Sequence, residues 1–350
     1  MNIGIKITKK DIITIVLLSI VFFGIAAWNV GSISYPVTNW QSTTTESFYV
    51  NLGSNQQVQN VYFWVHSGNA TVDVYTGGPG NWSYQAQFTN GLQPRGTDYS
   101  VYQTLGLNVI TQYLEFNVTA VNYDSQPMFS NWGIINPSDQ PLSPFIQVSE
   151  IGVENIAYQQ IPIVGITGLD TSDATIGKLV DEQNKLEIPP TYMSKMYFDE
   201  VYFARAAENY VNHQIPNERT HPPLGKLIEA SGIVFFGETP FGWRIMGVVF
   251  ATLMIPLMYL LGKKLFGTWI GGFSAAFLLA FDFMHFTMAR IGTVDTYVVF
   301  FSLLSQLFLL IYFIDVVNNG FKKTSVLPLF IAVIFFALGI STKWFTIYGA

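Results

Sequence analysis

Two adjacent carboxylates, Asp199 and Glu200, stand where a polar stretch of the chain gives way to an apolar one. They open a helical pattern that ends near Tyr210. A carboxylate that is partly desolvated at such a border has a raised pKa, which suits a general base that takes a proton from a hydroxyl. Acidic residues also favour the first turn of a helix, where they complement its dipole. The pair therefore predicts either a catalytic base or a helix start.

A second stretch, from Glu218 to Lys226, reads Glu-Arg-Thr-His-Pro-Pro-Leu-Gly-Lys. Its two prolines fix an extended backbone and its glycine permits close backbone approach, so we expect a loop of defined shape. His221 in this loop is either a ligand or base, or a structural histidine. The apolar run after Lys226 is too short to cross a bilayer, which indicates a segment that lies along the membrane surface.

Several basic residues lie near or within apolar sequence, where a charged side chain is costly and usually faces an interior cavity or a partner. They are Arg205, Arg219, Lys226, Arg244, Arg290 and Lys343. One interpretation gives them a shared counter-ion, the phosphate of an anionic lipid headgroup. The other pairs them with internal carboxylates, namely Glu200, Glu218, Asp282 and Asp295. Both stay open, and for Asp295 we expect a helix-dipole role or a bridge to Arg290.

Composition indicates a membrane protein, because 50% of the residues are hydrophobic and only 11% are charged, against roughly 25% in soluble domains. Apolar runs of spanning or nearly spanning length cover residues 12–28, 241–261, 268–281, 294–317 and 327–340. Lysine clusters flank these runs on one side, which the retention of basic residues identifies as cytoplasmic. The sequence thus predicts a multi-pass cell-membrane protein whose residues 30–190 are extracytoplasmic.

The extracytoplasmic part reads in alternation of apolar and polar residues, as in Val58-Gln-Asn-Val-Tyr-Phe-Trp-Val, with turn signals between the runs. This pattern predicts an antiparallel β-sandwich or jelly roll over residues 35–168. Residues 169–195 are polar, contain two consecutive prolines, and are interpreted as a connector back to the membrane. The tryptophans of this part either pack in the core or stack on a sugar ring; they are Trp40, Trp64, Trp82 and Trp132.

Several of these motifs, in this order, resemble those of the protein O-mannosyltransferase family, the dolichyl-phosphate-mannose dependent enzymes with the C-type glycosyltransferase fold. The matching pieces are Phe198-Asp-Glu, His221-Pro-Pro-Leu-Gly-Lys, Gly242-Trp-Arg-Ile-Met-Gly, Ala280-Phe-Asp, Ala289-Arg-Ile-Gly-Thr-Val-Asp and Ser341-Thr-Lys-Trp. The resemblance covers about residues 196–350 and the first span, and leaves the β-rich insertion outside the common family core. Many family members carry an acidic residue just before the HPP triplet, where this chain has Thr220, with Glu218 as the nearest acid.

The resemblance implies an inverting transfer in which Asp199 activates a serine or threonine hydroxyl that attacks the anomeric carbon of a lipid-phosphate sugar. It makes Glu200 the second catalytic residue, which orders the acceptor side, and makes Arg244 a ligand that steadies the lipid phosphate. The donor-phosphate and substrate-binding candidates are Arg244, His221, Lys226, Glu218 and Arg290. Such a reaction needs no metal or cofactor, and His221, Asp282 and His285 match no metal-ligand spacing.

The fold expected is therefore of the α+β class, a multi-pass helical membrane domain with an inserted β-sandwich. Its parts are a cytoplasmic N-terminus with the first helix (1–34), the extracytoplasmic β-sandwich (35–168), the connector (169–195), and a glycosyltransferase region (196–350) that we expect to be the N-terminal portion of a longer one. The partners expected are a polyprenyl- or dolichyl-phosphate sugar, an exported acceptor protein and membrane lipids, without nucleic acid; an oligomer is left open. Two alternatives remain, namely a lipid or glycan acceptor, and a membrane-anchored glycan-binding surface protein.

Overall fold

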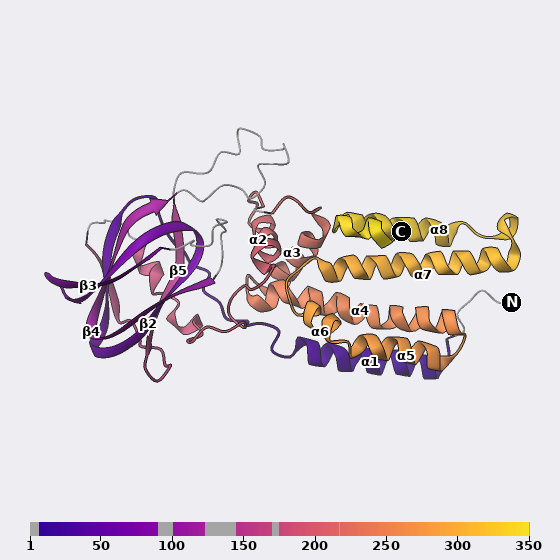
Figure 1. The fold of residues 1–350 in the computed structure, drawn as a ribbon, viewed down its shortest axis with the longest axis horizontal. Coiled ribbons are helices and arrows are strands. Elements are labelled where there is room, and N and C mark those ends of the chain that lie inside the picture. The colour runs from indigo at the N-terminus through magenta and orange to yellow at the C-terminus, as the bar shows by residue number, and fades with distance from the viewer. Residues whose placement is uncertain (1–6, 90–100, 123–144, 170–174, 217, 350) are drawn as a thin grey trace, which may run out of the picture. The chain divides into compact units, whose positions relative to one another are not determined.

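A computed structural model describes residues 7–89, 101–122, 145–169, 175–216 and 218–349 (Figure 1). The chain divides into two compact units. One comprises Met1–Ile33 with Tyr197–Ala350, and is called the helical unit here. The other, Ser34–Met196, is called the β unit.

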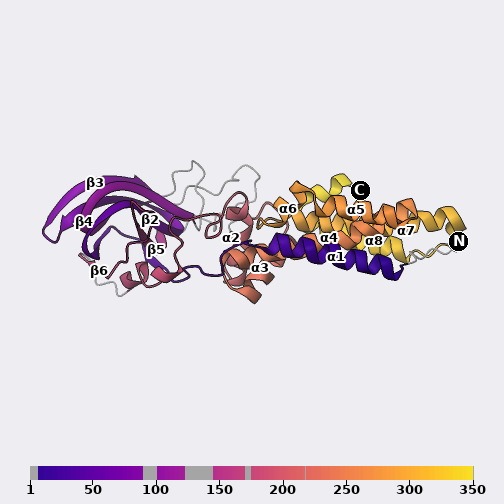
Figure 2. The same ribbon diagram turned by 90° about the horizontal axis from the view of Figure 1, so that it is seen from below.

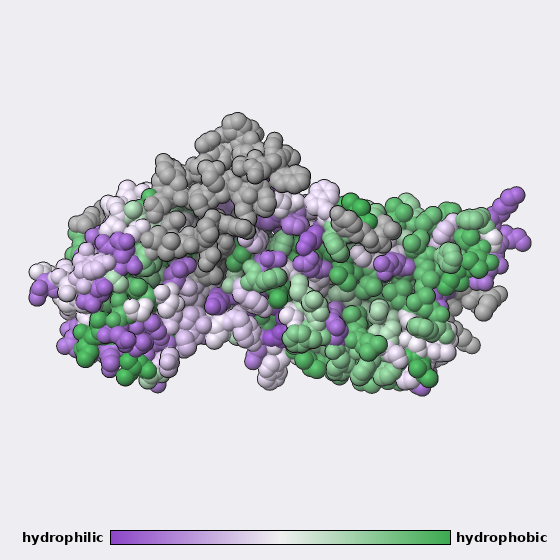
Figure 3. Space-filling model, in the orientation of Figure 1, coloured by the Kyte–Doolittle hydropathy of each residue, from purple (hydrophilic) through white to green (hydrophobic). Residues whose placement is uncertain are grey.

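Among the described residues of the helical unit, three helices are long and apolar enough to cross a membrane: α1 (Lys9–Ala27), α4 (Pro240–Phe266) and α7 (Asp295–Asn319). At the span expected over 268–281, α5 (Trp269–Ala280) and α6 (Phe283–Ala289) meet at an angle of 57°, a bend that fits either a broken span or a re-entrant loop. The last expected span is the shorter helix α8 (Leu327–Ile340). Figures 1 and 2 show α1, α4, α5, α7 and α8 lying side by side. Their outward surface is largely hydrophobic in Figure 3, as lipid contact requires.

Local sequence fixes where these helices begin and end. Thr8 and Asp11 form a capping box at the start of α1, in which each side chain accepts a backbone hydrogen bond of the other residue. The hydroxyls of Thr239 and Thr268 likewise cap α4 and α5. Gly267 ends α4 in the left-handed conformation with a φ of 69°, which a residue without Cβ adopts at little cost.

Two shorter helices, α2 (Glu200–Val211) and α3 (Leu224–Phe236), carry the acidic pair and the residues after the prolines. Helix α3 approaches its neighbours closely at its glycines. A Cβ on Gly225 would lie 2.6 Å from Val294 Cγ1, and one on Gly232 would lie 2.4 Å from the Gly242 carbonyl oxygen. These positions therefore admit no side chain, and the loop before α3 is held against the start of α7.

The part of the β unit that the structure describes forms one antiparallel sheet of six strands: β1 (Trp40–Ser42), β2 (Glu46–Gly78), β3 (Asn81–Thr89), β4 (Val101–Asn122), β5 (Ile146–Asn155) and β6 (Gly165–Gly168). Two stretches of the long strand β2 pair with the same stretch of β4, one on each side of it. Tyr113 of β4 therefore lies between Asn51 and Gly77, which both belong to β2. The antiparallel β prediction is confirmed, while the sandwich or jelly-roll arrangement stays a prediction. Two short 3₁₀ helices, η3 (Ile176–Leu179) and η4 (Gln183–Lys185), lie in the segment interpreted as a connector.

The core of the β unit forms on one face of these strands, as the alternation predicts. Phe48, Phe116 and Val74 stand opposite one another in register, and all three are buried. Trp40 and Trp64 are also buried, with 2% and 0% of their surface exposed, so they pack in the interior and present no ring to a sugar. Trp82 is partly exposed, and Trp132 lies outside the described residues.

Candidate active site

Asp199 lies at the N-cap of α2, yet its side chain accepts no capping hydrogen bond. Within the described part of the chain, no hydrogen bond to its carboxylate is present, and the side chain is partly exposed. The preceding residue, Phe198, has a φ of 55°, a region that a bulky side chain rarely occupies and that costs conformational energy. Backbone strain and an unengaged carboxylate therefore coincide at one position.

The electrostatic surroundings of Asp199 consist of one acid and two bases from distant parts of the chain. Burial raises the pKa of Asp199, and the carboxylate of Asp295 raises it further. Lys343 and His221 oppose that rise. A carboxylate with this balance holds a proton more readily than a free aspartate, as a general base must once it has accepted one.

Glu200 forms the most enclosed ion pair of the helical unit. Its Oε1 accepts from Arg244 Nε at 2.6 Å, and its Oε2 accepts from Arg244 Nη2 at 2.7 Å. The same carboxylate accepts from the backbone N–H groups of Gly292 at 2.8 Å and Tyr197 at 3.1 Å. Arg244 Nη1 donates to the Val30 carbonyl at 3.0 Å. Both side chains have 0% exposure, so this pair joins the starts of α2 and α4 to the chain after α1 and the loop before α7.

This geometry corrects two sequence-based expectations. Arg244 cannot serve as an exposed ligand of a lipid phosphate in this conformation, because its guanidinium is buried and bound bidentately to Glu200. Glu200 presents no surface to an acceptor for the same reason. The alternative interpretation, an internal ion pair, describes both residues, and since Glu200 directly follows Asp199 the pair fixes the backbone from which Asp199 projects.

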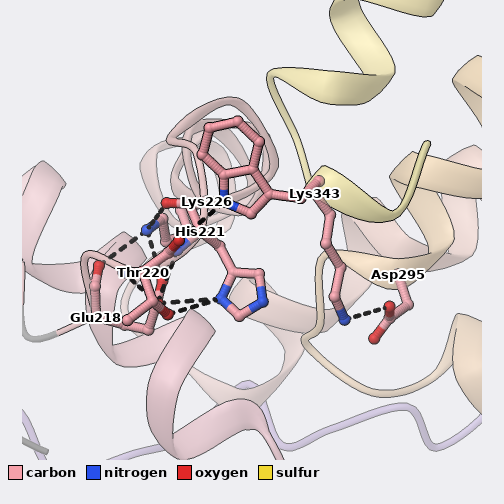
Figure 4. Close-up of polar contacts among 7 residues, drawn as sticks. Glu218, Thr220, His221, Lys226, Asp295 and Lys343 are labelled. Atoms are coloured by element: carbon pink, nitrogen blue, oxygen red, sulfur yellow. Dashed lines mark hydrogen bonds and ion pairs between the residues drawn. The ribbon is translucent and has the colours of Figure 1, made fainter. Parts of the chain in front are cut away.

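Glu218 organises the loop that contains the two prolines (Figure 4). Its Oε1 accepts from the backbone N–H of Thr220 at 2.7 Å and of His221 at 3.0 Å, and lies 3.1 Å from His221 Nδ1. The hydroxyl of Thr220 also donates to it. Lys226 Nζ donates to Oε2 at 2.7 Å and to the carbonyls of Glu218 and His221 at 2.8 and 2.9 Å. The loop thus closes around one carboxylate.

Hydrogen bonds to Glu218 change its pKa more than its burial does. Donors from His221, Lys226 and Thr220 lower the pKa of Glu218 to about 2, although burial by itself would raise it. Lys226 is 1% exposed and its ammonium is fully engaged. Glu218 and Lys226 therefore shape the loop, whereas the ring of His221 remains partly exposed, with an edge-on contact to Phe203.

Lys343 and Asp295 form an ion pair that sequence reasoning did not assemble. Lys343 Nζ lies 2.7 Å from Asp295 Oδ1, and both side chains are partly exposed. Asp295 stands in the first turn of α7, as the dipole interpretation expects, but its partner is Lys343 and not Arg290. Next to Lys343, Trp344 Nε1 donates to the Thr220 carbonyl at 3.1 Å, which ties this segment to the proline loop (Figure 4).

Arg290 contacts the end of α1 and none of the residues described above. Its Nη1 donates to the carbonyls of Ala26 at 2.8 Å and Trp28 at 2.6 Å, and its Nη2 donates to that of Asn29 at 2.7 Å. These carbonyls are at the C-terminal end of α1, where a cation complements the helix dipole and satisfies groups that have no intrahelical donor. Arg290 is thus engaged by a helix end and is not assigned to donor binding.

Of the ionisable residues that the sequence singled out, the structure brings Asp199, His221, Asp295 and Lys343 into one electrostatic group. The described residues include no cluster of three or more His, Asp or Glu side chains suited to a metal. Lys343 belongs to the motif Ser341-Thr-Lys-Trp and was recognisable as a cation in apolar sequence, but its pairing was not. The positive φ of Phe198 has no signal in the sequence.

Comparison with known proteins covers the motifs from the proline loop onward, whereas Asp199 and Glu200 lie before the residues that the family model matches. Residues 220–350 match the family described as dolichyl-phosphate-mannose-protein mannosyltransferase. A polyprenol-phosphate-mannose-protein mannosyltransferase of Corynebacterium glutamicum is 41% identical over 81 residues. Residues 220–350 are therefore similar to this mannosyltransferase family. A protein of the same name from Mycobacterium tuberculosis is 28% identical over 142 residues.

The match to these mannosyltransferases is partial on both sides. It covers 23% of this chain and 16% of the Corynebacterium protein, and 39% of this chain and 26% of the Mycobacterium protein. Part of the chain also aligns with the structure of CBM32 of AlyQ in complex with 4,5-unsaturated mannuronic acid. That alignment covers 36% of this chain and 84% of the other at 12% identity and a TM-score of 0.23, so no property is carried over from it.

Proposed function

We propose that this chain takes part in the transfer of a mannosyl group from a polyprenyl- or dolichyl-phosphate carrier to a serine or threonine hydroxyl of an exported protein. The observation that carries the proposal is the state of Asp199, which has no hydrogen-bonding partner among the described residues and lies in an electrostatic group with two bases. The names of the related proteins, which specify a polyprenol-phosphate-mannose donor and a protein acceptor, support the choice of substrates.

In the proposed reaction Asp199 takes the proton of the acceptor hydroxyl as that oxygen attacks the anomeric carbon from the side opposite the phosphate. The bond from that carbon to the phosphate oxygen breaks, its electron pair leaves with the polyprenyl phosphate, and the configuration inverts. Burial of Asp199 favours the protonated product of this step. Protonation also removes the repulsion between Asp199 and the neighbouring Asp295.

We assign contact with the departing phosphate to Lys343 and His221, and no longer to Arg244. Both side chains are partly exposed and lie within electrostatic reach of Asp199. A phosphate there would bind Lys343 in competition with Asp295, which now holds its ammonium. The ion pair of Glu200 with Arg244 and the hydrogen bonds of Glu218 would act as positioning elements, since they fix the backbone on either side of the site.

The proposal places the reaction at the extracytoplasmic face of the cell membrane, in a multi-pass protein. The lysine clusters beside the apolar segments support this orientation. Three long apolar helices and the bent pair α5–α6 support repeated crossing of the bilayer. A lipid-phosphate donor would then have its headgroup at the depth of the loops that precede α3 and α7.

The test is transfer of radiolabelled mannose from polyprenyl-phosphate mannose to a serine- and threonine-rich peptide in membranes that contain the full-length protein. We expect Asp199→Asn to lower the rate about 10²- to 10⁴-fold, the usual contribution of a general base. Asp282→Asn is the matched control, because Asp282 caps α6 through its side chain and asparagine caps equally well.

The two variants must be compared at equal protein levels in the membrane. Normal transfer by Asp199→Asn would refute its role as base. The configuration at the anomeric carbon is measured by NMR on the wild-type product. Retained configuration there would refute the inverting displacement while leaving the enzyme class intact.

A further inference from the structure

The sheet of the β unit has a second face, opposite the core, on which aromatic rings gather. Residues that stand opposite one another in register share a face of the sheet, and so do residues two apart in a strand. One transverse row on this face contains Tyr49, Glu115, Tyr75 and Tyr84. The next row contains Asn51, Tyr113, Gly77 and Trp82. We call the five rings, Tyr49, Tyr75, Trp82, Tyr84 and Tyr113, the aromatic face.

The rings of the aromatic face contact one another across strands. The ring of Tyr49 lies 5.7 Å from that of Trp82 and 5.8 Å from that of Tyr113, centroid to centroid. Tyr75 and Tyr84 form a second contact at 5.6 Å. Gly77 stands between Tyr113 and Trp82 in its row, and since it has no side chain the indole can extend over the strand toward Tyr49. The result is two groups of contacting rings in adjacent rows on the same face of the sheet.

These rings are not needed for the core. The aliphatic residues of the same strand segments, such as Val50, Val74 and Leu114, all point to the other face and are buried there. The rings of the aromatic face remain partly exposed, and Tyr84 keeps 55% of its surface exposed. Five large aromatic side chains that keep part of their surface exposed on one face of a sheet indicate a binding surface.

Acceptors and donors of hydrogen bonds lie among the rings. The carboxylates of Asp73 and Glu115 act on the Tyr75 hydroxyl, so both lie close to it. Gln112 Nε2 donates to Tyr113 Oη and to Asn51 Oδ1, each at 3.3 Å. Asp73, Asn51 and Gln112 are partly exposed beside the rings, where a ligand stacked on the rings would meet them, whereas Glu115 is buried.

This combination fits a sugar better than it fits a protein or a lipid headgroup. A pyranose has apolar C–H faces that stack on rings and a rim of hydroxyls that bond to carboxylates and amides. Protein interfaces are enriched in arginine as well as in aromatic rings and are depleted of acidic residues, whereas segments 47–51, 73–77, 82–87 and 113–117 contain two acidic residues and neither lysine nor arginine. The absence of basic residues there also disfavours anionic lipids and anionic glycans, which Asp73 and Glu115 would repel.

We propose that the aromatic face of the β unit binds neutral oligosaccharide, with Trp82, Tyr84 and Tyr113 as stacking platforms. This site is separate from the residues assigned to sugar transfer and does not depend on that assignment. It gives the β unit a role of its own, namely holding a glycan chain at the surface of the protein.

The experiment titrates the full-length protein in lipid nanodiscs with four tetrasaccharides by calorimetry. The neutral probes are mannotetraose, cellotetraose and maltotetraose, and the anionic probe is tetragalacturonate. We expect at least one neutral probe to bind with a Kd between about 10 µM and 1 mM, and tetragalacturonate to bind at least tenfold more weakly. Trp82→Ala should weaken the bound probe at least tenfold, and Tyr84→Ala at least threefold.

Controls separate the site from the rest of the molecule. Tyr158→Ala removes an exposed tyrosine of the same unit outside the aromatic face and should leave binding unchanged. Asp199→Asn should abolish transfer and leave binding unchanged, which distinguishes failure of this proposal from failure of the proposed enzyme activity. If Trp82→Ala lowers the melting temperature, its effect on binding is set aside and the binding of Tyr84→Ala tests the proposal, because Tyr84 is highly exposed. The proposal is overturned if no neutral probe binds, if tetragalacturonate binds most tightly, or if both ring variants bind as the wild type does.

Discussion

The buried pair of Glu200 and Arg244 offers the sharpest test of how the site is held. Glu200→Gln keeps the shape of the side chain but removes its charge, which leaves a buried guanidinium without its counter-ion. Two charge-assisted hydrogen bonds are lost or weakened, at about 1.5–3 kcal/mol each. Breaking one partner of a buried pair costs about 3–5 kcal/mol, and the two estimates agree.

The expected loss corresponds to a fall in the melting temperature on the order of 10 °C for a domain of this size. Thermal unfolding of the full-length protein in detergent, followed by tryptophan fluorescence at one scan rate, measures it. Glu238→Gln is the matched control, because Glu238 is partly exposed and forms no ion pair within the described structure; it should melt within about 1 °C of the wild type.

A second replacement distinguishes geometry from charge alone. Arg244→Lys retains the positive charge but cannot form the two parallel bonds to the carboxylate, so we expect it to destabilise nearly as much as Glu200→Gln. The reasoning fails if Glu200→Gln melts with the wild type, or if Arg244→Lys does. Both variants should also lower mannosyl transfer, because the residue after Asp199 loses its anchor.

Three further outcomes follow from the same structure. Complete burial holds the pKa of Glu229 well above its usual value. The folded protein therefore binds this proton more tightly than the unfolded chain does, and the free energy of unfolding falls as the pH rises above the pKa of the unfolded carboxyl. In Glu229→Gln this fall should be smaller, and at pH 8 the variant should be more stable than the wild type. Hydrogen bonds lower the pKa of Glu218 to about 2. Its ionised form therefore contributes on the order of 3 kcal/mol to the free energy of unfolding at neutral pH, and this contribution is lost as the pH falls from about 5 toward 2. Acid denaturation of Glu218→Gln should lack this loss. Arg290→Ala should lower the free energy of hydrogen-exchange protection in the last turn of α1 by about 1–2 kcal/mol, and Arg290→Lys should lower it by an intermediate amount.

The sequence predicted the elements better than it predicted their contacts. The apolar run at 241–261 lies within α4, the run at 294–317 coincides with α7 from its N-cap Val294 onward, and the alternation around Val58 lies within β2. The bend between α5 and α6 was missed, because a run of apolar residues does not reveal where a helix turns within it. The partners of Arg290 were missed as well, since the carbonyls at a helix end attract a cation as a carboxylate does, and no side-chain pattern marks them.

By itself, the sequence determined that this protein has apolar helices, an antiparallel β unit, and an acidic pair and a proline loop next to them, because periodicity, caps and turn residues act over a few positions. Only the tertiary structure decided which cation meets which carboxylate. Glu200 and Arg244 are 44 positions apart, and Asp295 and Lys343 are 48 apart. In a buried setting each of several cations could neutralise each of several acids at similar cost, so the choice rests on how the helices pack. That packing leaves the carboxylate of Asp199 without a hydrogen bond from any described residue.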